Sequence, residues 1–241
     1  MVIIPTDAPN AVAATNAIHE GDVAALRRLL ADHPELATAA LGTEGGMTRT
    51  LLHVVTDWPG HFPNGPLTVA VLVEAGADVN ARFTGPHTET PLHWAASSDD
   101  VAVLDALLDA GAEIEARGAV IAGGTPMADA TAFGQWDAAR RLLERGAATT
   151  TWEAAALGLL DRVEAAFDSD PEESAEGVTG ALWGACHGGH RAVAEYLVGR
   201  GADVNWIGWD HLTPLDVAER AEAMDVVEWL RGLGAKAAGQ H

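Results

Sequence analysis

The chain has 241 residues, of which 14 are lysine or arginine and 35 are aspartate or glutamate, so its formal charge is −21 at pH 7. A negative field of this size repels phosphate backbones and anionic lipid headgroups. We therefore expect neither nucleic acid nor a membrane as a partner, and we favour a cationic one. Cys186 is the only cysteine, which excludes an intramolecular disulfide and a multi-thiolate metal site.

Residues 1–5 read Met-Val-Ile-Ile-Pro, and they lack the basic start and the long apolar core of a signal peptide. No apolar run in the chain approaches the roughly 18 residues that a membrane helix needs. We therefore expect a cytoplasmic protein, and we expect it to be a monomer. Lys236 is the only lysine in a chain rich in alanine and glycine, a usage that favours a GC-rich bacterial source.

Four helix starts along the chain share one motif. Three copies are Thr90-Pro-Leu-His, Thr125-Pro-Met-Ala and Thr213-Pro-Leu-Asp, and Thr50-Leu-Leu-His is a looser copy. Threonine caps a helix well because its side-chain oxygen accepts a free backbone N–H. Proline fits the first helical position, where its missing N–H is not needed. Each motif therefore predicts the start of a helix.

Each apolar helical pattern that follows ends at a Gly-Ala pair. These pairs begin at residues 76, 111, 146, 201 and 234, so the intervals are 35, 35, 55 and 33 residues. Glycine ends a helix well because it adopts the left-handed conformation without strain. The sequence therefore predicts helix pairs at a regular spacing, with a shortened pair inside the interval of 55 residues.

A period near 33 residues, with Thr-Pro-Leu-His and Gly-Ala-Asp-Val-Asn, resembles the ankyrin repeat family. The resemblance implies an all-α solenoid of about seven helix pairs with short hairpin loops, each pair packing against its neighbours. We expect a single ankyrin-repeat domain over residues 10–236 and a frayed tail at 237–241. The expected repeats are 10–41, 46–80, 81–115, 120–150, 151–170, 177–205 and 208–236, and the one at 151–170 is truncated.

The second repeat carries an insertion of about five residues within 57–66. Two glycines and three prolines in this segment predict a defined loop rather than a longer helix. Trp58 and Phe62 give the loop apolar area to bury. We expect it to be ordered and to lean over the concave side of repeats two and three.

Two carboxylates, Asp129 and Glu153, stand in neighbouring repeats at helix positions that the repeat pattern fills with packed apolar residues. Burying a carboxylate without a partner costs several kcal/mol or shifts its pKa. One interpretation is a ligand pocket with these two as its floor, Trp94, Trp152 and Trp183 as its walls, and at least one raised pKa. The other is that the truncated repeat turns Glu153 toward solvent, and both remain open.

The resemblance also implies that partners bind at the hairpin tips and near the ends of the first helices. On this chain those positions are acidic, aromatic and rich in histidine, which indicates a recognition surface on the concave face. The predicted binding residues are Arg49, Asp57, Trp58, His61, Phe62, His87, Glu89, Trp94, Ser97, Asp129, Phe133, Glu153, Trp183, His187 and Trp209.

We therefore expect a recognition module that binds a protein or a cationic small molecule, because carboxylates beside aromatic rings suit ion pairing and cation–π contact. The alternative is a small-molecule enzyme on an ankyrin scaffold. Its acid/base pair would be Asp129 and Glu153, with Asp57 and His61 as further candidates. The sequence contains no phosphate-binding loop, dinucleotide fingerprint or nucleophile motif, which favours the binding module.

We expect no cofactor and no metal. His53, Asp57 and His61 follow one another at intervals of four residues, which invites a metal site. The resemblance, however, implies that His53 bonds its own turn, and His61 lies beyond Pro59. A zinc site also needs a clear third ligand and ordered partners around it.

Overall fold

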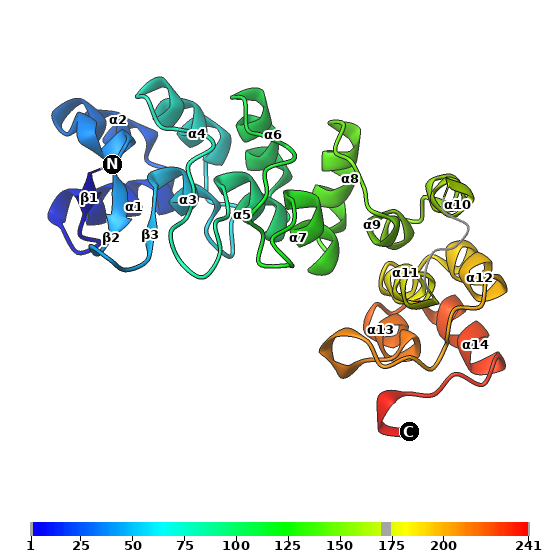
Figure 1. Ribbon diagram of the computed structural model, residues 1–241. Coiled ribbons are helices and arrows are strands. Elements are labelled where there is room, and N and C mark those ends of the chain that lie inside the picture. The colour runs from blue at the N-terminus through cyan, green and yellow to red at the C-terminus, as the bar shows by residue number, and fades with distance from the viewer. Residues whose placement is uncertain (1, 170–174, 241) are drawn as a thin grey trace. The chain divides into compact units, whose positions relative to one another are not determined.

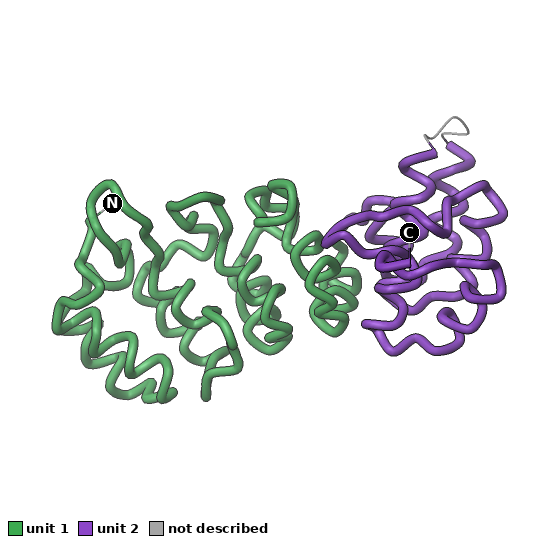
Figure 2. Tube along the Cα trace, turned by 90° about the horizontal axis from the view of Figure 1, so that it is seen from below, with its two compact units in different colours: residues 1–147 green, residues 148–241 purple. Residues whose placement is uncertain are grey.

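The computed structural model describes residues 2–169 and 175–240, and in these residues short strands accompany a succession of paired helices (Figure 1). The all-α solenoid expected from the repeats is confirmed. The chain forms two compact units, residues 1–147 and 148–241, coloured separately in Figure 2. The predicted domain of residues 10–236 and its repeat bounds stay predictions.

Unit 1 contains four helix pairs. They are α1 (Pro9–Glu20) with α2 (Val23–Asp32), α3 (Leu51–Thr56) with α4 (Gly65–Glu74), α5 (Pro91–Ser97) with α6 (Val101–Asp109), and α7 (Pro126–Ala132) with α8 (Trp136–Glu144). The first helices α1, α3, α5 and α7 contact one another in turn, and the second helices form a second row beside them (Figure 1). Leu51, Leu92 and Leu104 are fully buried between the rows, so each pair covers the apolar face of the next.

A small sheet precedes α3, after the short 3₁₀ helix Pro34–Ala37. Strand β1 (Ile3–Ile4) runs parallel to β2 (Ala40–Gly42), and β2 pairs antiparallel with β3 (Thr48–Arg49). The β2–β3 pair is the expected hairpin, whereas β1 lies outside the predicted repeats. Two apolar residues at the N-terminal end of the chain therefore add a strand to the first hairpin.

Two buried histidines connect neighbouring repeats. The Nδ1 atoms of His53 and His93 accept the backbone N–H of Thr50 and Thr90 at 3.2 and 3.1 Å. Their Nε2 atoms face the backbone oxygens of Glu89 and Gly124 in the following hairpin. Burial is the main cause that lowers the pKa of both imidazoles to about 4. Each ring is therefore neutral, with Nδ1 accepting and Nε2 donating.

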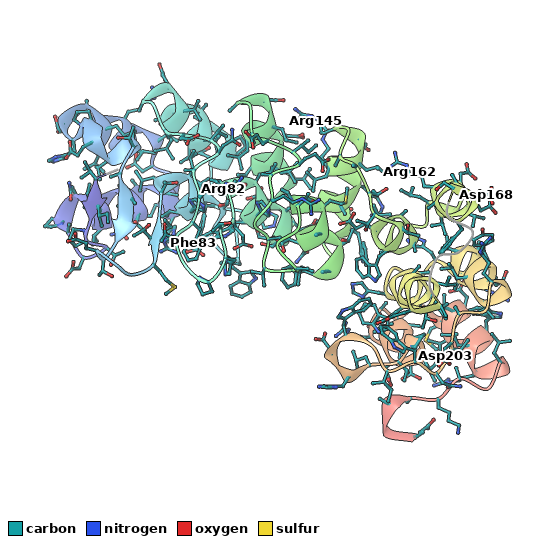
Figure 3. The ribbon with its side chains drawn as sticks, viewed as in Figure 1. Arg82, Phe83, Arg145, Arg162, Asp168 and Asp203 are labelled. Atoms are coloured by element: carbon teal, nitrogen blue, oxygen red, sulfur yellow. The ribbon has the colours of Figure 1, made fainter. Side chains whose placement is uncertain are left out.

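The second helices α6 and α8 are joined by ion pairs. Asp105 contacts Arg141 at 2.8 Å and Arg145 at 2.7 Å, and Arg145, labelled in Figure 3, also reaches Asp109 at 2.7 Å. Burial would raise the pKa of Asp105, but its hydrogen bonds from the two arginines lower it below the usual range. These ion pairs lie where the side chains of Asp105, Arg141 and Arg145 are partly exposed.

The described residues of unit 2 form three helix pairs: α9 (Thr151–Ala156) with α10 (Leu160–Ser169), α11 (Ala175–His187) with α12 (Arg191–Gly199), and α13 (Pro214–Arg220) with α14 (Met224–Gly232). Short 3₁₀ turns occur at Trp209–His211 and Ala238–Gln240. Helix α11 is buried from Val178 to His187, and it contacts α9, α12 and α13. It is the central helix of the unit.

The C-terminal segment of unit 2 is attached rather than frayed. The backbone N–H of Ala238 donates to Asp216 Oδ2 at 2.9 Å, and Lys236 N–H donates to Asn205 Oδ1 at 2.8 Å. Among the described residues, no helix combines the length and the apolar character that crossing a membrane requires.

Candidate functional site

The inserted loop of unit 1 is tied to three neighbouring elements. The backbone N–H of His61 donates to Asp100 Oδ2 at 2.8 Å, and its Nε2 bonds the Ser98 carbonyl at 3.0 Å. Asn64 Nδ2 donates to the Gly21 carbonyl at 2.9 Å. The Phe62 ring stacks on His19 with 4.4 Å between centroids. The loop is therefore ordered, as its composition predicts.

Trp58 differs from the expectation that both loop aromatics are buried. Its residue is 81% exposed, whereas Phe62 is half-buried on His19. The anchoring bonds lie in the second half of the loop, and they leave Trp58 projecting where α3 ends. Beside it, Arg49 pairs with Asp57, so the charge next to this indole is locally balanced.

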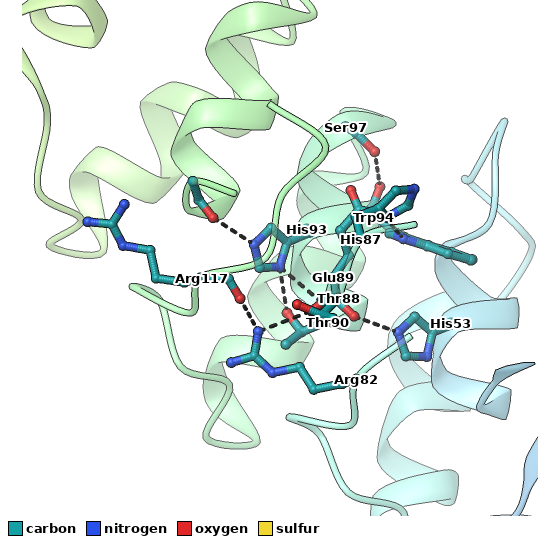
Figure 4. A network of polar contacts seen from close by, with 11 residues as sticks. His53, Arg82, His87, Thr88, Glu89, Thr90, His93, Trp94, Ser97 and Arg117 are labelled. Carbon is teal, nitrogen blue, oxygen red and sulfur yellow. Dashed lines mark hydrogen bonds and ion pairs between the residues drawn. The ribbon is translucent and has the colours of Figure 1, made fainter. Parts of the chain in front are cut away.

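A buried polar cluster lies at the hairpin that precedes α5 (Figure 4). Glu89 is only 4% exposed, and its Oε2 accepts Trp94 Nε1–H at 2.9 Å and contacts His87 Nδ1 at 2.6 Å. The His87 ring stacks on Phe83 with 5.2 Å between centroids. Three of the predicted binding residues, His87, Glu89 and Trp94, are thus one connected unit.

The same hairpin is tied to the next one by Arg82. Arg82 Nη1 donates to the Thr88 carbonyl at 3.1 Å and also to the Arg117 carbonyl. Figure 4 shows both of these contacts of Arg82, and Figure 3 labels Arg82 and its chain neighbour Phe83. The role of Arg82 was not predictable from the sequence, because it depends on backbone oxygens that carry no sequence signal.

Asp129, on α7, faces this cluster as a buried acid. Both of its carboxylate oxygens are buried, and no side-chain N–H or O–H donor of the described residues bonds them, whereas the backbone N–H of Ile121 favours the charged form of this carboxyl. Burial and, second, the charge of Glu89 raise the pKa of Asp129 to about 8. Two ionised carboxylates can only accept hydrogen bonds, whereas a protonated Asp129 can donate its O–H to Glu89. Asp129 therefore holds a proton at neutral pH, and the direction of its pKa shift agrees with the expectation from the repeat pattern.

Glu153, in unit 2, has a local role of its own. Its Oε2 accepts the Thr150 N–H at 2.7 Å, and Thr150 Oγ1 accepts the Glu153 N–H at 3.2 Å. This is a capping box at the start of α9. The side chain is buried, so the interpretation that it points to solvent is wrong.

Unit 2 carries a cluster of four tryptophans. Trp183 lies 6.3 Å from Trp152 and 5.2 Å from Trp209 between ring centroids, and Trp206 meets Trp209 edge-on at 5.3 Å. Trp183 is buried, and its Nε1–H donates to the Leu212 carbonyl at 3.1 Å. Trp183 is thus the buried member of the cluster, and the other three indoles are partly exposed.

These indoles line an open groove of about 500 Å³. Its lining residues are Trp152, Glu176, Gly177, Gly180, Ala181, Trp206, Ile207, Gly208 and Trp209. Sequence analysis selected Trp209 but missed Trp206 and Glu176. The close spacing of Trp206 and Trp209 inside one hairpin was the available signal, and the structure leaves Trp206 half-buried and Trp209 exposed.

The remaining predicted residues are placed as follows. Phe133 is 49% exposed at the end of α7, and the Ser97 carbonyl accepts Gln135 Nε2–H at 3.0 Å. His187 is buried against the Trp183 ring at 5.4 Å. Of the predicted binding residues, those from Arg49 to Phe133 lie in unit 1, and Glu153, Trp183, His187 and Trp209 lie in unit 2. No metal-binding group of three or more side chains occurs in the described residues.

The comparisons with known proteins agree with the fold. A family model described as ankyrin repeats, three copies, matches residues 62–152. The ankyrin repeat and KH domain-containing protein CBG24701 of Caenorhabditis briggsae is 31% identical over an alignment of 225 residues that covers 90% of this chain. The chain spans only 8% of that protein's length. Together with the paired helices and the Thr-Pro-Leu-His motifs, these matches show that the chain belongs to the ankyrin repeat family.

Proposed function

We propose that this chain is a recognition module that binds a cationic segment of a partner protein through the acidic, tryptophan-bearing face of its first helices and hairpins. Ankyrin repeats generally mediate protein–protein interaction. The observation that carries the proposal is Trp58, an indole that is 81% exposed on a loop held by four anchoring contacts.

A fixed, exposed tryptophan is suited to binding. Covering an indole removes about 200 Å² from water, which contributes roughly 4–5 kcal/mol before the costs of association. Because the loop around Trp58 is already ordered, little conformational entropy is lost when a partner covers it. Tryptophan is also among the residues that dominate the binding energy of interfaces.

The charge of the chain indicates the chemistry of the partner. A net charge of −21 accelerates encounter with a positive segment and opposes encounter with a negative one. Lysine and arginine side chains also bind favourably over an indole face. We therefore expect binding that weakens as the ionic strength rises.

The test is a selection of random peptides on the intact protein, followed by affinity measurements at two salt concentrations. We expect enrichment of arginine- and lysine-rich peptides. The Trp58→Ala variant should bind the selected peptides at least ten-fold more weakly. The matched control is Leu67→Ala, because Leu67 is 50% exposed on the second helix α4 and should change nothing. Enrichment of neutral or acidic peptides, or equal affinity of both variants, would refute the proposal.

The enzyme alternative has no observation in its favour. A catalytic acid or base must reach the substrate. The Asp129 oxygens are buried against Glu89, the Glu153 carboxylate caps α9, and Asp57 is paired with Arg49. We therefore do not propose a reaction. A cationic small molecule in place of a protein stays a possible outcome of the same binding test.

A further inference from the structure

We infer that the tryptophan groove of unit 2 binds the guanidinium group of an arginine side chain in the partner. This inference rests on the proposed function and adds a ligand class at a place that the sequence analysis did not define. The groove is formed by Trp152 from α9, by Glu176 on α11, and by Trp206 and Trp209 between α12 and α13.

The three groove tryptophans are held in fixed orientations. Trp209 meets Trp152 and Trp206 edge-on, at 6.0 and 5.3 Å between centroids, and both contacts are near perpendicular. Edge-to-face contacts of this kind are favourable because the positive ring edge faces the negative ring face. The groove therefore needs little rearrangement to receive a ligand.

Glycines make the space that the indoles occupy. A Cβ at Gly208 would lie 2.3 Å from Trp206 Cζ3, and a Cβ at Gly180 would lie 3.4 Å from Trp209 Cη2. A side chain at Gly208 would displace the Trp206 ring, and one at Gly180 would reach the floor of the groove. The position of the Trp206 ring thus depends on the glycine at 208, whereas a Cβ at Gly180 would make an ordinary contact with Trp209.

The charge of the groove favours a cation. Among the described residues that line it, Glu176 is the only charged one, and none of them is a lysine or an arginine. Indole faces attract cations, and tryptophan does so best among the aromatic residues. A neutral apolar ligand would use the rings but would leave the Glu176 carboxylate without a role.

Among cations, the guanidinium fits these groups best. It is planar and weakly hydrated, so it stacks on an aromatic face, and its N–H fork can bind one carboxylate with two hydrogen bonds. An ammonium is a strongly hydrated point charge and gains less from an open groove of about 500 Å³. Tryptophan faces together with Glu176 therefore match arginine.

The test follows the indole N–H signals of the full ¹⁵N-labelled chain, assigned through single Trp→Phe variants. The probes are the blocked peptide Gly-Arg-Gly and the matched citrulline peptide, which has nearly the same shape without the charge. We expect the arginine peptide to shift the signals of Trp152, Trp206 and Trp209 and the citrulline peptide to shift them little. Equal shifts with both peptides would overturn the inference.

Two variants sharpen the result. Glu176→Gln keeps the shape of the groove and should lower the affinity for the arginine peptide at least five-fold. Glu228→Gln is the control, because Glu228 is an exposed carboxylate on α14 outside the groove lining. Equal weakening by both variants would show a non-specific effect of charge and would overturn the inference.

The outcome is separable from that of the proposed function. If selected peptides still depend on Trp58 while the groove signals do not respond to arginine, the groove inference is wrong and the proposed function stands. A response of the groove to a proline-rich peptide, but not to the arginine peptide, would assign it instead to extended apolar segments.

Discussion

The buried proton on Asp129 predicts an unusual effect of the Asp129→Asn variant, which should be more stable than the parent protein at neutral pH. The pKa of Asp129 is raised from 3.8 to about 8 by burial and by the charge of Glu89. In the unfolded chain Asp129 is ionised at pH 7, and in the folded chain it must hold a proton. An asparagine avoids this difference, because it never ionises and its N–H₂ can still donate to Glu89.

The sign of the pH effect follows from the direction of the shift. A raised folded pKa contributes stability that is complete below the unfolded value of 3.8 and is lost as the pH rises toward 8. Each pH unit in this window is worth about 1.4 kcal/mol. Between pH 3.8 and pH 7 the free energy of unfolding of the parent protein therefore falls by at most about 4 kcal/mol, and that of the variant does not.

The buried histidines give the free energy of unfolding the opposite dependence on pH. The folded pKa values of His53 and His93 are lowered to about 4, so each gives stability that is present above 6.5 and is lost as the pH falls toward 4. Below pH 6.5 the two histidines change the free energy of unfolding more than Asp129 does, so stability rises with pH. Above pH 6.5 only Asp129, among these three groups, still changes it, so stability falls as the pH rises further. These groups therefore predict a stability maximum near pH 6.5.

The assay is urea unfolding followed by circular dichroism between pH 5 and 8.5. The variant and the parent share both histidines, so the difference between their unfolding free energies isolates Asp129. We expect this difference to grow with pH and to level off above pH 8. Asp137→Asn is the control, because the Asp137 side chain is 76% exposed on α8. A difference that is constant across pH, or that matches the control, would refute the buried proton.

Three further predictions concern packing and charge. His53→Ala removes both the cap at Thr50 and the bond to the Glu89 carbonyl, so urea unfolding should show a loss of about 2–4 kcal/mol. Gly184→Ala places a Cβ 3.0 Å from Trp152 Nε1 and should lower the melting temperature and shift the tryptophan emission, whereas Gly199→Ala, with open space around it, should not. Arg145→Ala breaks the contacts to Asp105 and Asp109, so it should reduce stability at low salt, and the difference should shrink as salt is added.

The fold was predictable because its signals are local and repeat. Thr50 and Thr90 cap helices where the motif placed them, and the glycines at 76, 111, 146, 201 and 234 all have the left-handed φ that ends a helix. Strand β1 was not predictable, because two apolar residues carry no period and their pairing depends on β2 far along the chain.

The candidate site was predictable only in part. Reading equivalent repeat positions singled out Asp129, Trp152 and Trp183 as departures from the pattern, and all three have unusual surroundings in the structure. The reading could not identify Glu89 as the carboxylate that raises the pKa of Asp129. Glu89 stands in a hairpin, and the contact depends on how that hairpin folds against α7.

The departures from the repeat pattern compensate one another across neighbouring repeats. Trp152 is a large residue where the motif has histidine, and the next repeat has Gly184 at the following helix position, where a Cβ would lie only 3.0 Å from Trp152 Nε1 and would press on the indole. Asp129 is an acid at an apolar position, and the preceding repeat supplies Glu89, so that one proton can satisfy both. Each member of such a pair is suited to the other, so a substitution at one of them changes which residue fits best at the other position. Gly184→Ala and Trp152→Leu should therefore be less damaging together than the sum of their separate effects, because the smaller leucine gives the new methyl group room.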